Sequence, residues 1–382
     1  MIEPPWIWPR AAYIHLPFCA HQCGYCDFAV AVGKDDQRAA YLKALAAELT
    51  RLQTPQPIDT LFFGGGTPTY LAASELEACV DSVLAWLPLK PGHEFSVEAN
   101  PGTLDDEKLR ILVDRGLTRL SLGAQSFDPD LLRVLERDHQ PADVFRAMEL
   151  ARRYDISASI DLIFGVPGQT TEQWRRDLDL ALSLNPEGVA TYGLTYEKGT
   201  RLWKQRRDGG ILALDEENER TLYDTAIDVL EAAGYVHCEL SNFARPGKEC
   251  RHNHVYWANE AHFGFGMGAA EFVRGVRNLN TRDFGTYIRR AETGRSPVFQ
   301  TETLPPRESA FETIGQNLRR RMGIQRRRFR EQTGFSVDDL ASAAITRLVE
   351  LNLLRDDGEN LFLTREGKCV ADNVALEFWK EC

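Results

Sequence analysis

The chain has 382 residues, of which 43% are hydrophobic and 26% are charged, and this composition excludes a globally disordered protein. The formal net charge of −11 argues against general binding of nucleic acid, which depends on neutralising phosphates. No apolar run approaches the roughly 20 residues that span a bilayer, and the N-terminal residues lack the pattern of a secretory signal. We therefore expect a cytoplasmic protein.

Strand-like and helix-like segments alternate from about residue 10 to residue 195. The strand-like segments are AAYIHL (11–16), IDTLFFGGG (58–66), EFSVEAN (94–100), LTRLSLGAQS (117–126), ISASIDLIFGVPGQ (156–169) and GVATYGLTY (188–196). Six such units in a row predict a parallel sheet with right-handed crossovers, and their lengths favour a partial (β/α)6 barrel. In barrels of this kind, the loops after the carboxyl ends of the strands form the active site.

The pattern changes after Gly199. Residues 235–244 (YVHCELSNFA) are typical of a single strand, and residues 296–309 (SPVFQTETLPPRES) are typical of a linker. Beyond this linker, helical segments and a hairpin at 355–363 resemble a winged helix. The predicted fold class is therefore α/β, a partial barrel followed by a small C-terminal winged-helix-like domain. The predicted domains are 1–205 for the barrel, 206–300 for a barrel extension and 301–382 for the C-terminal domain.

Three cysteines, Cys19, Cys23 and Cys26, fall within eight residues in the first predicted strand-to-helix loop. Structural zinc prefers four ligands in two separated pairs, and no clean second pair follows, although His15 and His21 could complete a tetrahedron. A [4Fe–4S] cluster needs four iron ligands, so three cysteines would leave one iron open to a small molecule. The spacing therefore favours an iron–sulfur cluster over zinc.

A glycine-rich stretch, GGGTPT at 64–69, occupies the second predicted loop and lets backbone amides approach a charged ligand closely. Together with the CxxxCxxC spacing, it resembles the radical S-adenosylmethionine (SAM) superfamily. In that superfamily, the amino and carboxylate groups of SAM chelate the open iron of a [4Fe–4S] cluster, and an electron from the cluster cleaves SAM to a 5′-deoxyadenosyl radical. The resemblance implies that the three cysteines hold such a cluster and that SAM binds beside it.

A closer likeness is carried by the segments YIHLPFC, CGYCDF, FFGGGTPTYL, LGAQSF and IDLIFGVPGQT. They are similar to the branch that contains oxygen-independent coproporphyrinogen III oxidase, over most of residues 11–200 and into the C-terminal unit. The SAM contacts that this resemblance implies are Tyr13, Tyr25, Gly65, Gly66, Thr67, Glu98, Gln125, Arg137, Asp161 and Gly193. Of these, Glu98, Gln125 and Asp161 lie at or just after the ends of predicted strands, where their oxygens can accept hydrogen bonds from ribose hydroxyls.

Two features depart from the oxidase pattern. Phe28 stands where the oxidases carry a fourth cysteine, and only 18 residues precede Cys19, whereas the oxidases have a longer N-terminal extension. Both features are instead similar to the haem chaperone family HemW, whose members read CxxxCxYCDF. The sequence HNHVYW, at 252–257, also resembles the HNxxYW pattern that is associated with haem binding in this family.

The resemblance to HemW implies a haem-binding set made of His252, His254, Tyr256 and Trp257. An imidazole can ligate haem iron, and aromatic rings can pack against the macrocycle. We favour His252 as the iron ligand because the family pattern names it. Cys250, His252 and His254 also form a C-x-H-x-H cluster that could bind zinc.

The sequence thus predicts a haem chaperone that binds a [4Fe–4S] cluster, SAM and haem and delivers haem to haem-dependent respiratory enzymes, without needing to turn over a substrate. Its expected partners are haem and haem-accepting enzymes, which could be membrane-associated, and a homodimer stays open. The alternatives are a radical SAM enzyme, such as oxygen-independent coproporphyrinogen III oxidase or a SAM-dependent modifying enzyme, and a winged-helix regulator that senses iron. The seven arginines between 319 and 330 are typical of a solvated helix face, and Asp356, Asp357 and Glu359 would repel phosphate, so we expect no nucleic-acid partner.

Overall fold

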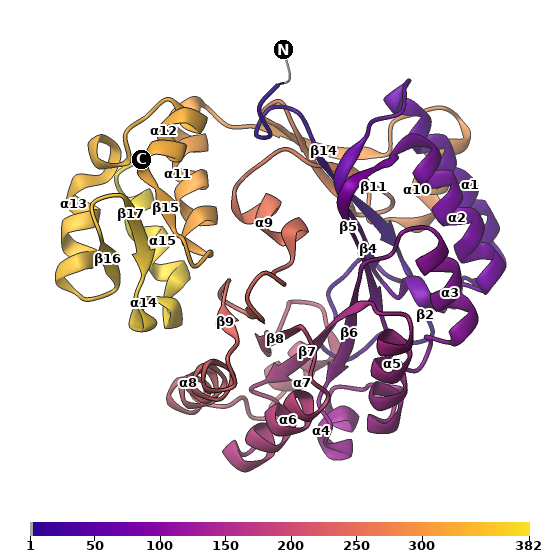
Figure 1. Ribbon diagram of the computed structural model, residues 1–382, viewed down its shortest axis with the longest axis horizontal. Coiled ribbons are helices and arrows are strands. Elements are labelled where there is room, and N and C mark those ends of the chain that lie inside the picture. Colours follow the sequence, from indigo (N-terminus) through magenta and orange to yellow (C-terminus); the bar gives the residue numbers. More distant parts are fainter. Residues whose placement is uncertain (1–2) are drawn as a thin grey trace.

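A curved sheet at the centre of the molecule contains all six predicted strands (Figure 1). The computed structural model describes residues 3–382, and its largest sheet has nine strands in the order β11-β1-β4-β5-β6-β7-β8-β10-β9. The predicted strands are parallel neighbours in chain order, namely β1 (Ala11–Leu16), β4 (Ile58–Gly65), β5 (Leu89–Ala99), β6 (Arg119–Gln125), β7 (Ser157–Phe164) and β8 (Gly188–Gly193). This arrangement confirms the predicted partial barrel.

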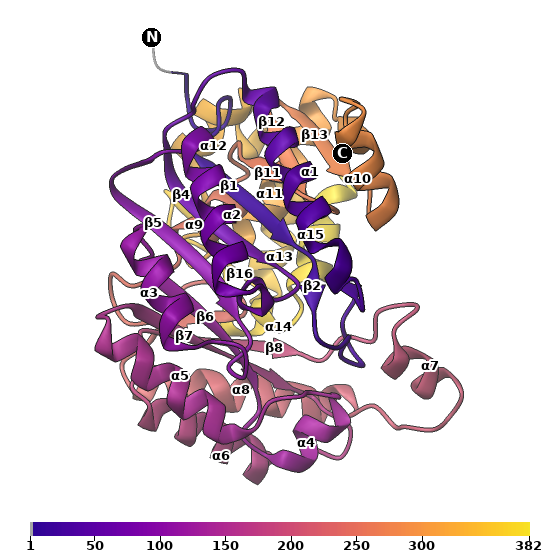
Figure 2. The ribbon, with the colours of Figure 1, turned by 90° about the vertical axis from the view of Figure 1, so that its right-hand side faces the viewer.

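Helices cover the outer face of this sheet (Figures 1 and 2). They are α1 (Arg38–Leu49), α2 (Ala73–Trp86), α3 (Asp106–Asp114), α4 (Pro129–Val134), α5 (Pro141–Arg153), α6 (Thr171–Ser183) and α8 (Glu216–Ala232). Alternate residues of a strand face these helices, as Leu61 and Phe63 of β4 do, and both are fully buried in the main hydrophobic core. Their neighbours Thr60 and Phe62 face the barrel interior, where both contact His252.

Capping side chains begin several of the outer helices. Asp105 Oδ1 accepts a hydrogen bond from the Lys108 amide at 2.8 Å before α3, and Thr170 Oγ1 accepts one from the Gln173 amide at 3.2 Å before α6. Gly116 follows α3 with a φ of 91°, a left-handed conformation that favours glycine. Short polar residues and glycine thus set the limits of the helices that support the barrel.

A short helix, α9 (Arg251–Trp257), lies inside the ring formed by the curved sheet and the C-terminal domain (Figure 1). Glu94 of β5 holds its first turn, because the carboxylate accepts hydrogen bonds from the Arg251 and His252 amides, each at 2.9 Å. A carboxylate at this position satisfies amides that a helix leaves unpaired and complements the helix dipole. The sequence around α9 showed no clear period, because a helix of two turns inside a barrel contacts protein on several sides.

Two local predictions were wrong. Residues 235–244 form a tight hairpin rather than one strand, since β9 (Val236–His237) and β10 (Asn242–Ala244) are antiparallel neighbours. Much of the predicted linker at 296–309 is β14 (Val298–Thr303), which extends a sheet with β12 (Ala270–Val273) and β13 (Val276–Asn280). Both errors concern strands that depend on tertiary pairing more than on local pattern.

The remaining elements complete the edge of the barrel and a second hydrophobic core. They are β11 (Phe263–Phe265), parallel to β1, and α10 (Phe284–Glu292), followed by α11 (Pro306–Leu318), β15 (Ile324–Gln325), α12 (Arg326–Thr333), α13 (Val337–Glu350), β16 (Leu354–Asp356), β17 (Asn360–Leu363), α14 (Arg365–Cys369) and α15 (Ala371–Trp379). The elements from α11 onward bury their own core and carry the predicted hairpin, as a winged helix does. Among residues 3–382, no helix has the length and apolarity needed to cross a membrane.

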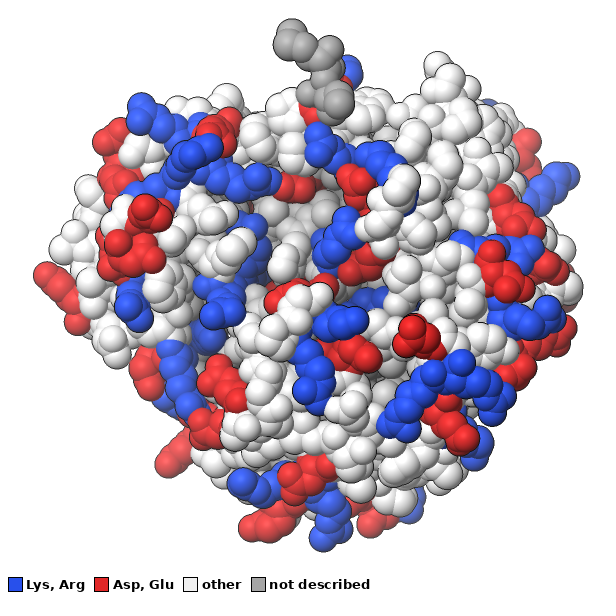
Figure 3. Space-filling model, in the orientation of Figure 1, with Lys and Arg blue, Asp and Glu red and all other residues white. Residues whose placement is uncertain are grey.

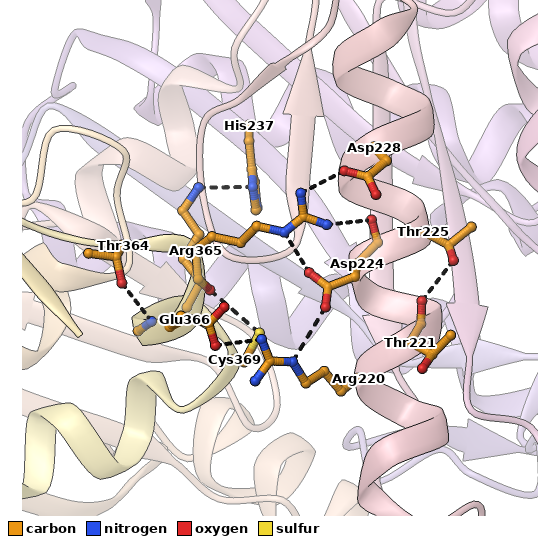
Figure 4. A network of polar contacts seen from close by, with 12 residues as sticks. Arg220, Thr221, Asp224, Thr225, Asp228, His237, Thr364, Arg365, Glu366 and Cys369 are labelled. Carbon is orange, nitrogen blue, oxygen red and sulfur yellow. Dashed lines mark hydrogen bonds and ion pairs between the residues drawn. The ribbon is translucent and has the colours of Figure 1, made fainter. Parts of the chain in front are cut away.

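A network of ion pairs joins α14 to the long helix α8 (Figure 4). Arg365 donates from Nε to Asp224 Oδ1 and from Nη1 to Asp228 Oδ1, both at 2.6 Å, and Lys368 Nζ lies 3.0 Å from His237 Nδ1. These contacts fix the C-terminal elements against the barrel, beside the hairpin that follows α8.

We expect Arg365→Ala to lower the free energy of unfolding by about 1 kcal/mol, a small value because the network is partly exposed and screened by solvent. The loss should shrink further in ~1 M salt, where screening is strongest. Arg355→Ala is the matched control. Arg355 lies on β16, and in the described part of the chain its guanidinium contacts the Phe362 ring and forms no ion pair. Urea unfolding of the three proteins measures the effect, and equal stability of all three would contradict it.

Candidate functional site

A pocket with a volume of about 450 Å³ opens at the carboxyl ends of the parallel strands. Its wall includes all three clustered cysteines and residues that lie in the carboxyl-terminal halves of β4, β5, β6, β7 and β8 or in the loops after them. Nine of the ten predicted SAM contacts line it: Tyr25, Gly65, Gly66, Thr67, Glu98, Gln125, Arg137, Asp161 and Gly193. Tyr13 is the exception, since its hydroxyl lies behind the pocket wall, 3.1 Å from His15 Nδ1.

The cysteine loop is held at both ends and in its middle. The short parallel strands β2 (Phe18–Cys19) and β3 (Ala31–Val32) bring its ends together. In the middle, the Gly24 carbonyl accepts a hydrogen bond from the Leu202 amide at 2.9 Å. Leu202 belongs to α7 (Arg201–Arg207), a helix that projects from the barrel on the same side as β2 (Figure 2).

The three cysteines are free thiols with partly buried sulfur atoms. Burial raises the pKa of Cys19 to about 12 and also raises that of Cys26, so both are neutral thiols in the absence of a cation. Bound metal supplies the positive charge that stabilises thiolates in such surroundings. In the described part of the chain, no three His, Cys, Asp or Glu side chains converge on a point that a single metal ion could occupy. A cluster does not require such convergence, because each cysteine binds a different iron atom.

Arg137 places a buried positive charge beside the cysteines. Its Nη1 lies 3.5 Å from Cys23 Sγ, and its Nη2 donates to the Gly123 carbonyl at 2.7 Å. A guanidinium held in this way can offset the negative charge of thiolates or of a ligand carboxylate. The structure therefore brings Arg137 into the pocket, although it follows a helix rather than a strand.

The glycine loop after β4 is packed too tightly for side chains. A Cβ on Gly65, whose φ is 107°, would lie 2.4 Å from the His15 ring, and one on Gly66 would lie 2.6 Å from the Pro17 backbone. His15 Nε2 is 2.7 Å from the Ala29 carbonyl, so the imidazole joins the glycine loop to the end of the cysteine loop. Both ring nitrogens are hydrogen-bonded in this conformation, which disfavours His15 as a zinc ligand.

Two buried carboxyl groups face the pocket from neighbouring regions of the sheet. Glu98 Oε2 accepts a hydrogen bond from the Gly65 amide at 3.1 Å, and both oxygens of Asp161 accept from Ser121 Oγ at 3.0 Å. Burial raises the pKa of each carboxyl to about 7, and the charge of Asp161 adds to the effect on Glu98. These groups therefore change protonation near neutral pH.

Sequence reasoning missed Asn100, Ser121 and Tyr192, which also line the pocket. Asn100 directly follows β5, so the rule that polar residues at strand ends face the site would have found it. Ser121 and Tyr192 lie within strands, where only the observed register shows which face they occupy.

His252 lies in the barrel interior, away from this pocket, and has no exposed surface. Its Nδ1 is 2.9 Å from Thr60 Oγ1, its Nε2 is 2.9 Å from the Tyr256 hydroxyl, and its ring stacks on Phe62. Burial lowers its pKa to about 3. An imidazole that binds iron needs a free ring nitrogen, so the choice of His252 as the favoured haem ligand does not fit this conformation. The same engagement disfavours the zinc alternative at Cys250, whose thiol instead donates to Glu94.

His254 differs from His252 because its ring keeps a nitrogen without a hydrogen bond. Its Nε2 has no partner among the described residues, and the nearest carboxylate oxygen is Glu239 Oε1 at 3.7 Å. Trp257, one turn later, faces the Arg319 guanidinium at 5.5 Å. The two predicted sets approach each other at Tyr256, which lies within electrostatic reach of both Tyr13 and Glu98. His254 and Trp257 do not line the strand-end pocket.

Comparisons with known proteins agree with this architecture. Residues 13–181 match the Radical SAM superfamily, and residues 304–370 match the HemN C-terminal domain. The chain is 37% identical to "Heme chaperone HemW" of Bacillus subtilis over 97% of this chain and all of that protein. It is 34% identical to "Heme chaperone HemW" of Mycobacterium tuberculosis over 96% of this chain and 94% of that protein.

A solved structure shows the same fold. Coproporphyrinogen III oxidase (HemN) from Escherichia coli, described as a radical SAM enzyme, superposes with a TM-score of 0.85 at 22% identity, covering 97% of this chain and 90% of the oxidase. At this identity the likeness concerns the fold alone. The extended identity to HemW proteins decides the family, and the chain belongs to the HemW family of the radical SAM superfamily.

Proposed function

We propose that this protein is a haem chaperone that holds a [4Fe–4S] cluster and SAM in the strand-end pocket, binds haem separately and delivers it to haem-dependent respiratory enzymes from the cytoplasm. The observation that carries the proposal is the match to proteins named heme chaperone over almost the whole chain. His254 supports it, because its Nε2 lies outside the SAM pocket, buried 3.7 Å from Glu239 Oε1 and without a hydrogen bond among the described residues. A carrier needs a ligand for iron at a site that the cluster and SAM do not fill.

Cys19, Cys23 and Cys26 would hold the cluster, and Arg137 would offset its negative charge beside Cys23. The cluster supplies one-electron chemistry and an iron atom open to SAM. The cysteine loop is tied to α7 through the Gly24 carbonyl, and this contact would limit the movement of the three thiols.

Glu98, Asp161 and the glycine loop would hold SAM. The two carboxylates would accept hydrogen bonds from ribose hydroxyls, and the loop of Gly65 and Gly66 lets the ligand approach the backbone. Thr67 Oγ1 lies 3.6 Å from Cys19 Sγ, at the border between the SAM and cluster positions.

His254 would bind haem iron in place of His252. Desolvation lowers the pKa of His254, which keeps the imidazole neutral and its lone pair available at neutral pH. His252 would instead support α9 from inside, through Thr60 and Tyr256. Of the haem-binding residues predicted from the sequence, His254 would thus be the iron ligand, and the others would support its position.

A radical SAM enzyme is the second candidate, because nine of the ten residues expected to contact SAM line the pocket. Anaerobic incubation with SAM and a reductant decides between the two. Formation of 5′-deoxyadenosine that increases with an added substrate would favour the enzyme, whereas slow cleavage independent of substrate would favour the chaperone.

Cys26→Ala should abolish binding of the iron–sulfur cluster. The two remaining cysteines would leave one iron atom without the thiolate that Cys26 supplies. Iron and sulfide content after anaerobic reconstitution measures this loss. Cys369→Ala is the matched control, a partly exposed cysteine on α14 far from the pocket, and should leave the content unchanged. An unchanged iron content in Cys26→Ala would contradict the cluster assignment.

SAM should bind more weakly as the pH falls below about 7, because the ionised carboxylates of Glu98 and Asp161 accept stronger hydrogen bonds from hydroxyls than neutral carboxyl groups do. If binding requires one such group to be ionised, Kd should rise about fivefold between pH 7 and pH 6, and a requirement for both would multiply the effect. Calorimetric titration of SAM into cluster-loaded protein measures this. Asp161→Asn should flatten the dependence, and a Kd independent of pH in the unmodified protein would refute the assigned role.

His254→Ala should remove saturable haem binding, followed by the Soret band, whereas His252→Ala should retain it. The second variant should instead lose about 1–3 kcal/mol of stability, because Thr60 and Tyr256 each lose a buried hydrogen-bond partner. Thermal unfolding of both variants separates the two effects. Haem binding that survives His254→Ala and disappears in a folded His252→Ala would reverse the assignment.

A further inference from the structure

Arg320 lies at a backbone junction between the C-terminal domain and the barrel. Residues 319–321 pair with the turn after β9, since the Leu240 amide donates to the Arg319 carbonyl at 3.1 Å and the Arg321 amide donates to the Cys238 carbonyl at 2.9 Å. Arg320 stands directly opposite Glu239 in this antiparallel bridge. Opposite residues in such a pair project to the same side, so Arg320 shares a side with Glu239, the carboxylate beside His254.

The guanidinium of Arg320 is buried without a carboxylate in direct contact, although Glu260 and Glu239 lie within electrostatic reach. The residue is 8% exposed, and among residues 3–382 no carboxylate forms an ion pair with it. Its contacts are neutral acceptors, Asn317 Oδ1 and the Gly323 carbonyl, and its Nε has no hydrogen-bond partner in this part of the chain. Desolvation lowers its pKa to about 10, so it stays charged. A buried, unpaired charge is costly, and it requires an explanation beyond packing.

The charges around Arg320 leave it available to an anion. Glu260 is already bound by Arg328, and burial raises the pKa of Glu239 to about 7, which reduces its negative charge. The positive charge of Arg320 also acts on His254, where it contributes to the lowered pKa. Arg320 and His254 therefore lie within electrostatic reach of each other. The contact between Trp257 and Arg319 lies at the same junction.

The surface between the C-terminal helices and the barrel is hollowed where α9 lies, and Lys and Arg atoms border the hollow on both sides (Figure 3). An anionic ligand would be attracted to such an opening. A planar ligand that carries both a metal ion and carboxylates could reach a histidine and an arginine of this junction at the same time.

We infer that Arg320 binds a propionate carboxylate of the haem whose iron His254 ligates. This inference rests on the proposed haem-chaperone function. The propionate would supply the counterion that Arg320 lacks, through the paired hydrogen bonds that guanidinium and carboxylate form. Iron ligation by His254 would hold one part of the haem and the carboxylate contact another, so together they fix its orientation at the junction.

The test compares two ligands on the same full-length, cluster-loaded protein: haem, and haem with both propionates converted to methyl esters. Soret titrations in the same detergent solution measure the affinities. The unmodified protein should bind the free acid at least about tenfold more tightly than the ester, as a charge-assisted contact requires. Arg320→Met should bind both forms with similar affinity, and Arg320→Lys should keep part of the preference.

Arg327→Met is the matched control, because Arg327 is highly exposed on the neighbouring helix α12 and pairs only with Glu331 there. It should keep the full preference for the free acid. Equal affinities for the two ligands in the unmodified protein would overturn the inference without any variant, and so would a preference that persists in Arg320→Met. Absence of haem binding in every protein would instead contradict the proposed function itself.

Discussion

The two hydrogen bonds that Glu94 accepts from the first amides of α9 are the constraint on which the arrangement of sites depends. They hold a helix inside the barrel, where its residues His252 and Tyr256 fill the space beside Phe62. The interior is thereby divided into a strand-end pocket that stays open and a packed region that does not.

The open pocket is organised by contacts among its own residues. His15 joins the glycine loop to the cysteine loop, Ser121 orients Asp161, and the Gly65 amide orients Glu98. Contacts that fix a side chain or loop lower the entropic cost of binding a ligand. Burial also raises the pKa of both carboxyl groups to about 7, so the proposed binding of SAM would depend on pH.

The sequence predicts the barrel well, because six strands of alternating or continuous apolar residues, each followed by a helical pattern, permit few topologies. Cys19, Cys23 and Cys26 and the glycine loop are found for the same reason, since they follow strands directly. The roles of His15 and His252 could not be predicted, because the sequence does not show whether the ring nitrogens of a histidine are free or hydrogen-bonded. The sequence also does not distinguish Arg320 from the six other arginines between 319 and 330. The backbone pairing that buries Arg320 is seen only in the structure.

The central claim is that haem has a site of its own, distinct from the cysteine pocket. Haem titration into a chain with Cys19, Cys23 and Cys26 all replaced by alanine tests it most directly, because cysteine thiolates are themselves haem ligands. This variant should show saturable binding with the same Soret maximum and affinity as the unmodified protein. Loss of binding, or a shifted maximum, would place the haem at the cysteines instead.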